Sequence, residues 1–153
     1  MKKFNALETE SLRKLRSNSS LQLGAARAFY VGMDVKHLDS VPPFITKDGS
    51  EIRELLAYRN SAIRQQSLAE ARLPIGGTTQ EHYHVKAEEI YLITHGHGRI
   101  RIETELRDVQ AGDAIAIPPG KKHKLWNTGS EPLRLLCCCA PAYEHSDTIL
   151  TEP

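Results

Sequence analysis

The sequence predicts an all-β domain of the sandwich or barrel class, preceded by a short N-terminal arm. From Glu51 onward, short runs of strand length alternate with turn signals that contain glycine and proline, which is the pattern of such domains. The chain has 153 residues, enough for one domain with a sizeable hydrophobic core. No internal repeat is visible, so we expect a single barrel rather than two.

Residues 1–48 are expected to form the arm, because they are too few and too polar to enclose a core of their own. Leucines within residues 7–16 suit a short helix, although a helix of this length is marginal in isolation. Residues 22–31 fit either the end of a helix or a strand, and the pattern does not decide between them. Residues 47–50, KDGS, form a turn signal at the end of the arm.

The barrel is expected to span residues 49–145 and to be followed by a C-terminal tail at 146–153. Charged and apolar residues alternate in the segment RIRIE, at 99–103, which is typical of a half-buried strand. The expected strands cover residues 52–58, 65–73, 78–85, 89–94, 99–103, 106–110, 114–118, 123–127 and 133–139.

Composition narrows the classes of partner and the cellular compartment. Lysine and arginine number 20 against 19 aspartates and glutamates, so no strong field favours nucleic acid or an anionic membrane. No apolar run approaches the ~20 residues of a membrane helix, and the first residues lack the apolar stretch of a secretion signal. Cys137 to Cys139 are consecutive and form no disulfide framework, which predicts a reduced, cytoplasmic setting.

Four side chains within residues 76–127 have the chemistry of a metal site. His82 and His84 are one residue apart, so in a β-strand they point to the same face. Glu89 follows closely, and His123 lies on a later expected strand. Two imidazoles on one face, with a carboxylate and a distant third imidazole, are typical ligands of a mononuclear metal centre.

The glycines and prolines around these side chains carry a family resemblance. Gly76 to Asn127 resembles both cupin motifs, G-x5-HxH-x3,4-E-x6-G and G-x5-PxG-x2-H-x3-N, with every fixed position filled. The segments CCCAPAY and SLAEA are similar to those of small single-domain bacterial cupins, some of which are labelled mannose-6-phosphate-isomerase-like. The resemblance implies a double-stranded β-helix, the jelly-roll barrel of the cupins. The label describes a fold, so it implies no substrate.

The resemblance also implies the ligand set His82, His84, His123 and one carboxylate. The motif allows either Glu88 or Glu89, but the six-residue gap to Gly96 admits only Glu89. Three neutral imidazoles and one carboxylate leave two positions open on an octahedral ion. Mixed nitrogen and oxygen ligation suits Fe, Mn, Ni, Co or Zn, and the ligands alone do not choose among them.

The function that the resemblance implies is that of a metal-dependent enzyme acting on a small, anionic, oxygenated molecule. A dioxygenase, an isomerase and a lyase all fit, and the alternative is a non-catalytic module that binds a small molecule or sugar. Alternation from Glu89 places Tyr91 on the same inward face. Tyr91 is either a catalytic residue that donates a hydrogen bond to a metal-bound ligand or an aromatic side chain that fills the barrel. Lys121, Lys122 and Lys124 are either a solvated turn or a guide for an anionic substrate.

Three further expectations concern residues outside the metal cluster. Cys137 to Cys139 are expected to act as small apolar side chains rather than as nucleophiles or ligands. Asn127 is expected to cap a turn rather than to contact substrate. The scattered apolar residues of the arm suit a sheet edge or a second barrel, which predicts a homodimer with the arm at or near its interface.

Overall fold

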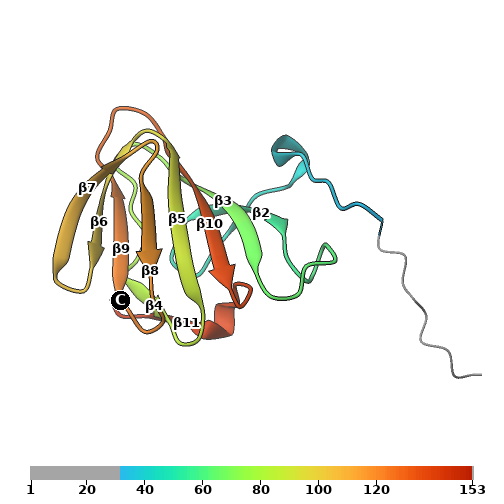
Figure 1. Ribbon diagram of the computed structural model, residues 1–153. Helices are drawn as coiled ribbons and strands as arrows, with labels where there is room; N and C mark the ends of the chain where they lie inside the picture. Colours follow the sequence, from blue (N-terminus) through green and yellow to red (C-terminus); the bar gives the residue numbers. More distant parts are fainter. Residues whose placement is uncertain (1–31, 153) are drawn as a thin grey trace, which may run out of the picture. The chain divides into compact units, whose positions relative to one another are not determined.

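The computed structural model describes residues 32–152 (Figure 1). The helix expected at 7–16 and the undecided segment at 22–31 lie outside the described residues. In the described range, two antiparallel sheets form the body of the domain, which confirms the predicted all-β jelly-roll barrel. Two short 3-10 helices, η1 (Leu38–Ser40) and η2 (His145–Asp147), are also present. No helix in this range is long and apolar enough to cross a membrane.

One sheet has six strands and the other has five, and every strand pairing is antiparallel. The six-stranded sheet follows the order β1 (Phe44–Ile45), β2 (Glu51–Leu56), β3 (Ser67–Leu73), β10 (Leu133–Ala140), β5 (Glu88–His95) and β8 (Ala114–Ile117). The five-stranded sheet follows the order β11 (Thr148–Leu150), β4 (His82–His84), β9 (His123–Asn127), β6 (His97–Ile102) and β7 (Glu105–Gln110).

The expected strands correspond in order to β2 through β10, and the structure adds one strand at each end. In β1, Phe44 pairs with Ile52, and in β11, Thr148 pairs with His84. The two sheets therefore also include residues on either side of 49–145, at 44–45 and at 148–150. Strands of two and three residues are too short to show a period of two, which is why the sequence pattern does not reveal them.

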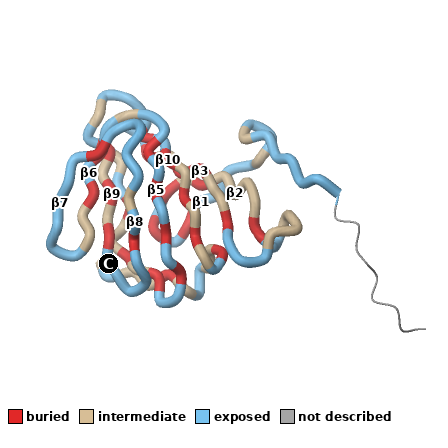
Figure 2. Tube along the Cα trace, viewed as in Figure 1, coloured by how far each residue is buried: buried red, intermediate tan, exposed pale blue. Residues whose placement is uncertain are grey.

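The core consists of side chains that alternate along each strand, as the alternating buried and exposed stretches in Figure 2 show. In β5, Glu89, Tyr91 and Ile93 are buried, whereas Ile90 and Leu92 are exposed. Burying each large apolar side chain contributes ~1.5–3 kcal/mol, so this alternation also fixes the register of the strands. The buried cluster comprises Ile52, Ala71, Leu73, Tyr91, Ile93, Ile100, Val109, Ile117, Leu125, Leu133, Leu135 and Cys137.

Candidate metal centre

Three strands bring the four predicted side chains together. His82 and His84 stand on β4, His123 begins β9 directly opposite His82, and Glu89 is the second residue of β5. One ligand atom from each residue lies within 4.8 Å of those of the other three, and all four side chains are buried. This geometry could hold a metal ion.

The register of β5 decides which of two neighbouring glutamates joins the cluster. Glu89 is buried in it, whereas Glu88 is exposed on the outer face. The strand ends at His95, and the next residue, Gly96, has a φ of 86°, in the left-handed region that favours glycine. A Cβ at Gly96 would also lie 3.2 Å from the carbonyl oxygen of Pro132. The turn thus places Glu89 inward, as the motif spacing predicts.

Hydrogen bonds to backbone carbonyls fix the tautomers of two histidines. His82 Nδ1 lies 2.8 Å from the Gln80 carbonyl oxygen, and His123 Nδ1 lies 3.0 Å from that of Lys121. A carbonyl oxygen only accepts, so each Nδ1 must carry the proton and donate it. In the neutral rings, Nε2 therefore keeps a free lone pair, which is the form that binds a metal.

The third histidine reaches the same tautomer through a hydroxyl. His84 Nδ1 lies 3.2 Å from Thr148 Oγ1, and Thr148 Oγ1 donates its proton to the Glu144 carbonyl oxygen at 3.1 Å. The hydroxyl has only one proton to give, so it accepts from His84 Nδ1. His84 Nε2 is left facing Glu89 Oε2 at 3.1 Å.

The cluster's own polar atoms are incompletely satisfied without a cation. His123 Nε2 is buried and has no hydrogen-bond partner among the described residues; its nearest acidic atom is Glu89 Oε2, at 3.5 Å. An unsatisfied buried polar atom costs ~1–3 kcal/mol. Three unprotonated nitrogens and one carboxylate oxygen offer four ligand atoms with free electron pairs, which is what a divalent transition-metal ion requires. The residues present therefore fit such an ion.

The electrostatics favour the protonation states that bind metal. Burial raises the pKa of Glu89, but hydrogen bonds and positive charge from the His123 and His84 rings, which act when Nε2 of these rings carries a proton, outweigh it and hold that pKa well below the usual value. Burial and the neighbouring His123 ring lower the pKa of His82. At neutral pH the carboxyl group is thus ionised and the His82 ring is neutral, as metal binding demands.

Cys139 orients the carboxylate from the other side. Its Sγ donates to Glu89 Oε1 at 3.3 Å, so Oε2 faces the histidines. Burial, followed by the charge of Glu89, raises the pKa of the Cys139 thiol, which therefore keeps the proton that it donates. The sequence analysis missed this contact. Cys139 and Glu89 are cross-strand neighbours on β10 and β5, and the pairing of those strands is the only signal that could have revealed it.

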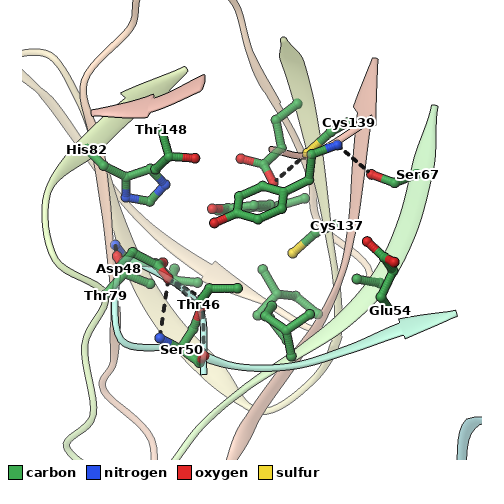
Figure 3. A pocket seen from close by; sticks show the side chains of 18 of the residues that line it. Thr46, Asp48, Ser50, Glu54, Ser67, Thr79, His82, Cys137, Cys139 and Thr148 are labelled. Atoms are coloured by element: carbon green, nitrogen blue, oxygen red, sulfur yellow. Dashed lines mark hydrogen bonds between the residues drawn. The ribbon is translucent and has the colours of Figure 1, made fainter. Parts of the chain in front are cut away.

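A cavity of about 50 Å³ adjoins the cluster inside the barrel (Figure 3). Tyr91, the predicted catalytic residue, lines it, and its ring centre lies 5.9 Å from that of His123. Burial, followed by the charge of Glu89, raises the pKa of Tyr91, so its hydroxyl stays protonated at neutral pH. Tyr143 also lines the cavity, and its buried hydroxyl has no partner within residues 32–152. Sequence reasoning missed Tyr143.

Two more lining residues come from segments expected to lie outside the barrel. Asp48 was assigned to the arm and Thr148 to the tail, yet both line the cavity (Figure 3). No lysine or arginine among the described residues lines it. Of the three lysines around His123, none lines this wall, and Lys124 pairs with Glu152 at 2.5 Å, which favours a solvated turn over a guide for an anion.

His95 and Asn127 lie away from the cluster. His95 is exposed and its Nε2 lies 2.7 Å from Glu131, so the inward alternation of β5 ends before it. Asn127 holds two loops together: the two protons of its Nδ2 are shared among three carbonyl oxygens within 3.1 Å, and its Oδ1 accepts from the Gly129 amide. The interpretation of Asn127 as a turn-capping residue agrees with these contacts.

Comparisons with known proteins place the fold in a family. A model of the cupin domain matches residues 69–139. The uncharacterised protein MJ1618 of Methanocaldococcus jannaschii is 47% identical over 114 residues, which covers 74% of this chain and 91% of the relative. The crystal structure of a predicted oxalate decarboxylase of Thermotoga maritima is 26% identical, with a TM-score of 0.63, covering 70% of this chain and 98% of that one. The polyketide cyclase RemF of Streptomyces resistomycificus has a TM-score of 0.67 at 19% identity, covering 80% and 87%, which is a likeness of fold alone.

The cupin match begins in β3 and ends in β10, so it includes the strands that carry all four clustered side chains. The Methanocaldococcus relative extends the likeness over most of the chain, at an identity at which two proteins share a fold. The barrel topology and the two filled motifs agree with both findings. The chain belongs to the cupin family.

Proposed function

We propose that the protein is a metal-dependent enzyme that acts on a small oxygenated molecule. The observation that carries the proposal is the convergence of three imidazole Nε2 atoms and one carboxylate, with every imidazole Nδ1 already engaged. Hydrogen bonds at Nδ1 orient the rings and leave the Nε2 lone pairs free for a metal ion. An ordinary apolar core does not require this arrangement. His82, His84, Glu89 and His123 would hold the ion, which is Fe, Mn, Ni, Co or Zn.

The bound ion would supply Lewis acidity to an oxygen atom of the substrate. The chain's own residues have separate tasks. Glu89 compensates one positive charge, and Cys139 holds it in place through its thiol proton. Tyr91, protonated because burial raises its pKa, would donate a hydrogen bond to a substrate oxygen beside His123. Tyr91 is thus a donor rather than a general base.

The cavity limits the size of the substrate. The centres of water-sized spheres have about 50 Å³ available, which leaves room for a small organic molecule rather than for a polymer. A molecule of a few heavy atoms fits without rearrangement of the barrel. The likeness to the Thermotoga protein, described as a predicted oxalate decarboxylase, supports an enzymatic role on a small oxygenated compound. Dioxygenase, isomerase and lyase chemistry remain the three options.

Metal analysis joined to a turnover assay tests the proposal. Protein purified without chelators should contain close to one transition-metal ion per chain, and a screen of small hydroxy and keto compounds should give a ligand that is consumed. Oxygen uptake during turnover separates a dioxygenase from an isomerase or a lyase. Full turnover by metal-free protein contradicts the proposal, and a ligand that binds but is never consumed favours the non-catalytic binding module.

A further inference from the structure

Asp48 is a buried carboxylate that the metal cluster does not use. It sits in the turn between β1 and β2, is only 7% exposed, and lines the same cavity as His82 (Figure 3). The turn is tied to the residues before β4 through its backbone, because the Asp48 carbonyl oxygen accepts from the Gln80 amide at 2.7 Å. The carboxylate is therefore a fixed part of the cavity wall beside the metal centre.

The two oxygens of this carboxylate differ sharply in their bonding. Asp48 Oδ1 accepts from the Thr46 hydroxyl at 2.5 Å, the Ser50 hydroxyl at 2.8 Å and the Ser50 amide at 3.3 Å. Asp48 Oδ2 has no hydrogen bond or ion pair with any residue from 32 to 152. Asp48 Oδ2 is not one of the fully enclosed side-chain atoms that lack a partner, so it stays accessible from the cavity and can accept a hydrogen bond from a molecule that binds there.

The two acidic side chains Glu54 and Asp48 line the cavity but differ in whether a cation neutralises them. Glu54 also lines the wall, but Arg59 neutralises it through an ion pair at 2.5 Å. Asp48 has no such cation, because Lys47 directs its Nζ to the Thr148 carbonyl oxygen instead. A second anionic group of a substrate would therefore meet an uncompensated negative charge, whereas a hydroxyl or an ammonium group would meet a hydrogen-bond acceptor.

We propose that Asp48 determines specificity by accepting a hydrogen bond from a hydroxyl or ammonium group of the substrate other than the group that binds the metal. This inference rests on the proposed function for the position of the metal. It narrows the expected substrate class from a small anionic, oxygenated molecule to one that combines a metal-binding oxygen group with a hydrogen-bond donor. The Tyr143 hydroxyl, also without a partner in the described residues, lines the same cavity and can complete the contact to a polar group.

The test uses ligands that differ only at one end. Malonate, 3-hydroxypropionate and β-alanine share a carboxylate and a three-carbon chain, and carry a carboxylate, a hydroxyl or an ammonium at the other end. Succinate, 4-hydroxybutyrate and 4-aminobutyrate repeat the series with one more carbon. Calorimetric titration of protein loaded with Mn²⁺ should show donor-bearing ligands binding about tenfold or more tightly than the dicarboxylate of equal length. The tighter of the two donor ligands identifies hydroxyl or ammonium as the preferred group.

Asp48→Asn keeps an acceptor for Thr46 and Ser50 but replaces the free oxygen by an amide that donates. The preference should then vanish or reverse, with the metal content and Tm of the protein unchanged. Glu54→Gln removes the same formal charge from a carboxylate that is already paired, and it should keep the wild-type ranking. The proposal is overturned if the Asp48→Asn protein keeps the wild-type order of ligand affinities. It is also overturned if Glu54→Gln abolishes that order equally.

Two more outcomes separate this inference from the proposed function. The role of Asp48 is overturned, whatever the metal content, if wild-type protein binds the dicarboxylates as tightly as the donor-bearing ligands. It is also overturned if wild-type protein binds none of the six ligands. Protein that takes up no Mn²⁺, Fe²⁺, Co²⁺, Ni²⁺ or Zn²⁺ refutes the metal site instead. In that case the ranking measured on metal-free wild-type and Asp48→Asn protein still decides whether Asp48 selects the donor.

Discussion

Two buried carboxylates face one cavity, and their surroundings differ in a way that matches different tasks. Both oxygens of Glu89 are engaged: Oε2 faces His84 and His123, and Oε1 accepts from Cys139. Asp48 has one oxygen with three donors and one with none among the described residues. The strand-borne carboxylate suits the proposed metal ion, and the turn-borne carboxylate suits the proposed exchangeable ligand.

The largest effect should come from removing the charge of Glu89. Glu89→Gln should lower metal affinity by more than ~100-fold, because changes of residues that only support a ligand already cost ~10–100-fold. Glu88→Gln removes the same charge from the exposed neighbour and should change the affinity less than about twofold. Metal content and a competition titration with a chromogenic chelator measure both. If Glu88→Gln loses metal and Glu89→Gln keeps it, the register of β5 is wrong; if both keep it, the site uses three histidines only.

Acidification should empty the site progressively below about pH 6, since free imidazole has a pKa of ~6.5 and only neutral rings bind. Burial and His123 lower the pKa of His82, so the folded chain resists protonation there and the loss begins below the free value. The same shift makes the metal-free fold less stable as pH falls through ~6.5, because the unfolded chain then binds the proton more readily. Metal content and Tm between pH 7.5 and 4.5 measure both. Metal retained at pH 4.5 contradicts ligation by histidine.

Histidine variants test the same pH argument residue by residue. His82→Ala, His84→Ala and His123→Ala should each lower metal occupancy at neutral pH. His97→Ala, at an exposed position of β6, should leave both occupancy and its pH profile unchanged. An equal loss in His97→Ala protein shows that the measured metal is bound at the surface rather than in the barrel.

The sequence predicts the strand-borne half of this comparison much better than the turn-borne half. The clustering of His82, His84 and His123 can be predicted from the two motifs and from the two-residue period of a strand. In a strand, side chains two residues apart point to the same face, so sequence spacing fixes which side chains face inward. Glu89 follows from its distance to Gly96. Asp48 shows no such signal, since a turn of the type KDGS has many surface uses and nothing in it indicates burial in a cavity.

Contacts between distant segments are the second limit of sequence reasoning. Cys139 reaches Glu89 only because β10 pairs with β5, and Thr148 reaches His84 only because β11 pairs with β4. Strand order follows from how the whole barrel closes rather than from any local pattern. The roles of Cys139 and Thr148 therefore become visible only in the structure.

A smaller effect is expected at the support of Glu89. Cys139→Ala removes the thiol donor and should weaken metal binding by about tenfold, whereas Cys139→Ser keeps a donor and should restore most of the affinity. Cys138→Ala is the matched control, because Cys138 is only partly buried and belongs to the alternate face of β10. Chelator titration of the three variants measures this. A serine variant as weak as the alanine variant shows that Cys139 acts by packing and not as a positioning residue.

The smallest effect on the metal centre should follow truncation of the arm, and two deletions separate its parts. Removing residues 1–31 should leave Asp48, the cavity and the metal content intact, because all of the described barrel follows them. If the arm contributes to the predicted homodimer, this deletion should weaken the dimer in sedimentation at micromolar concentration.

Removing residues 1–48 should also abolish the preference for donor-bearing ligands, while metal binding through β4, β5 and β9 stays detectable. A fully dimeric protein after deletion of 1–31 refutes the role of the arm, and a monomeric wild type refutes the dimer. Loss of metal in the longer deletion alone would show that the turn also supports the centre, and that the two carboxylates are not independent.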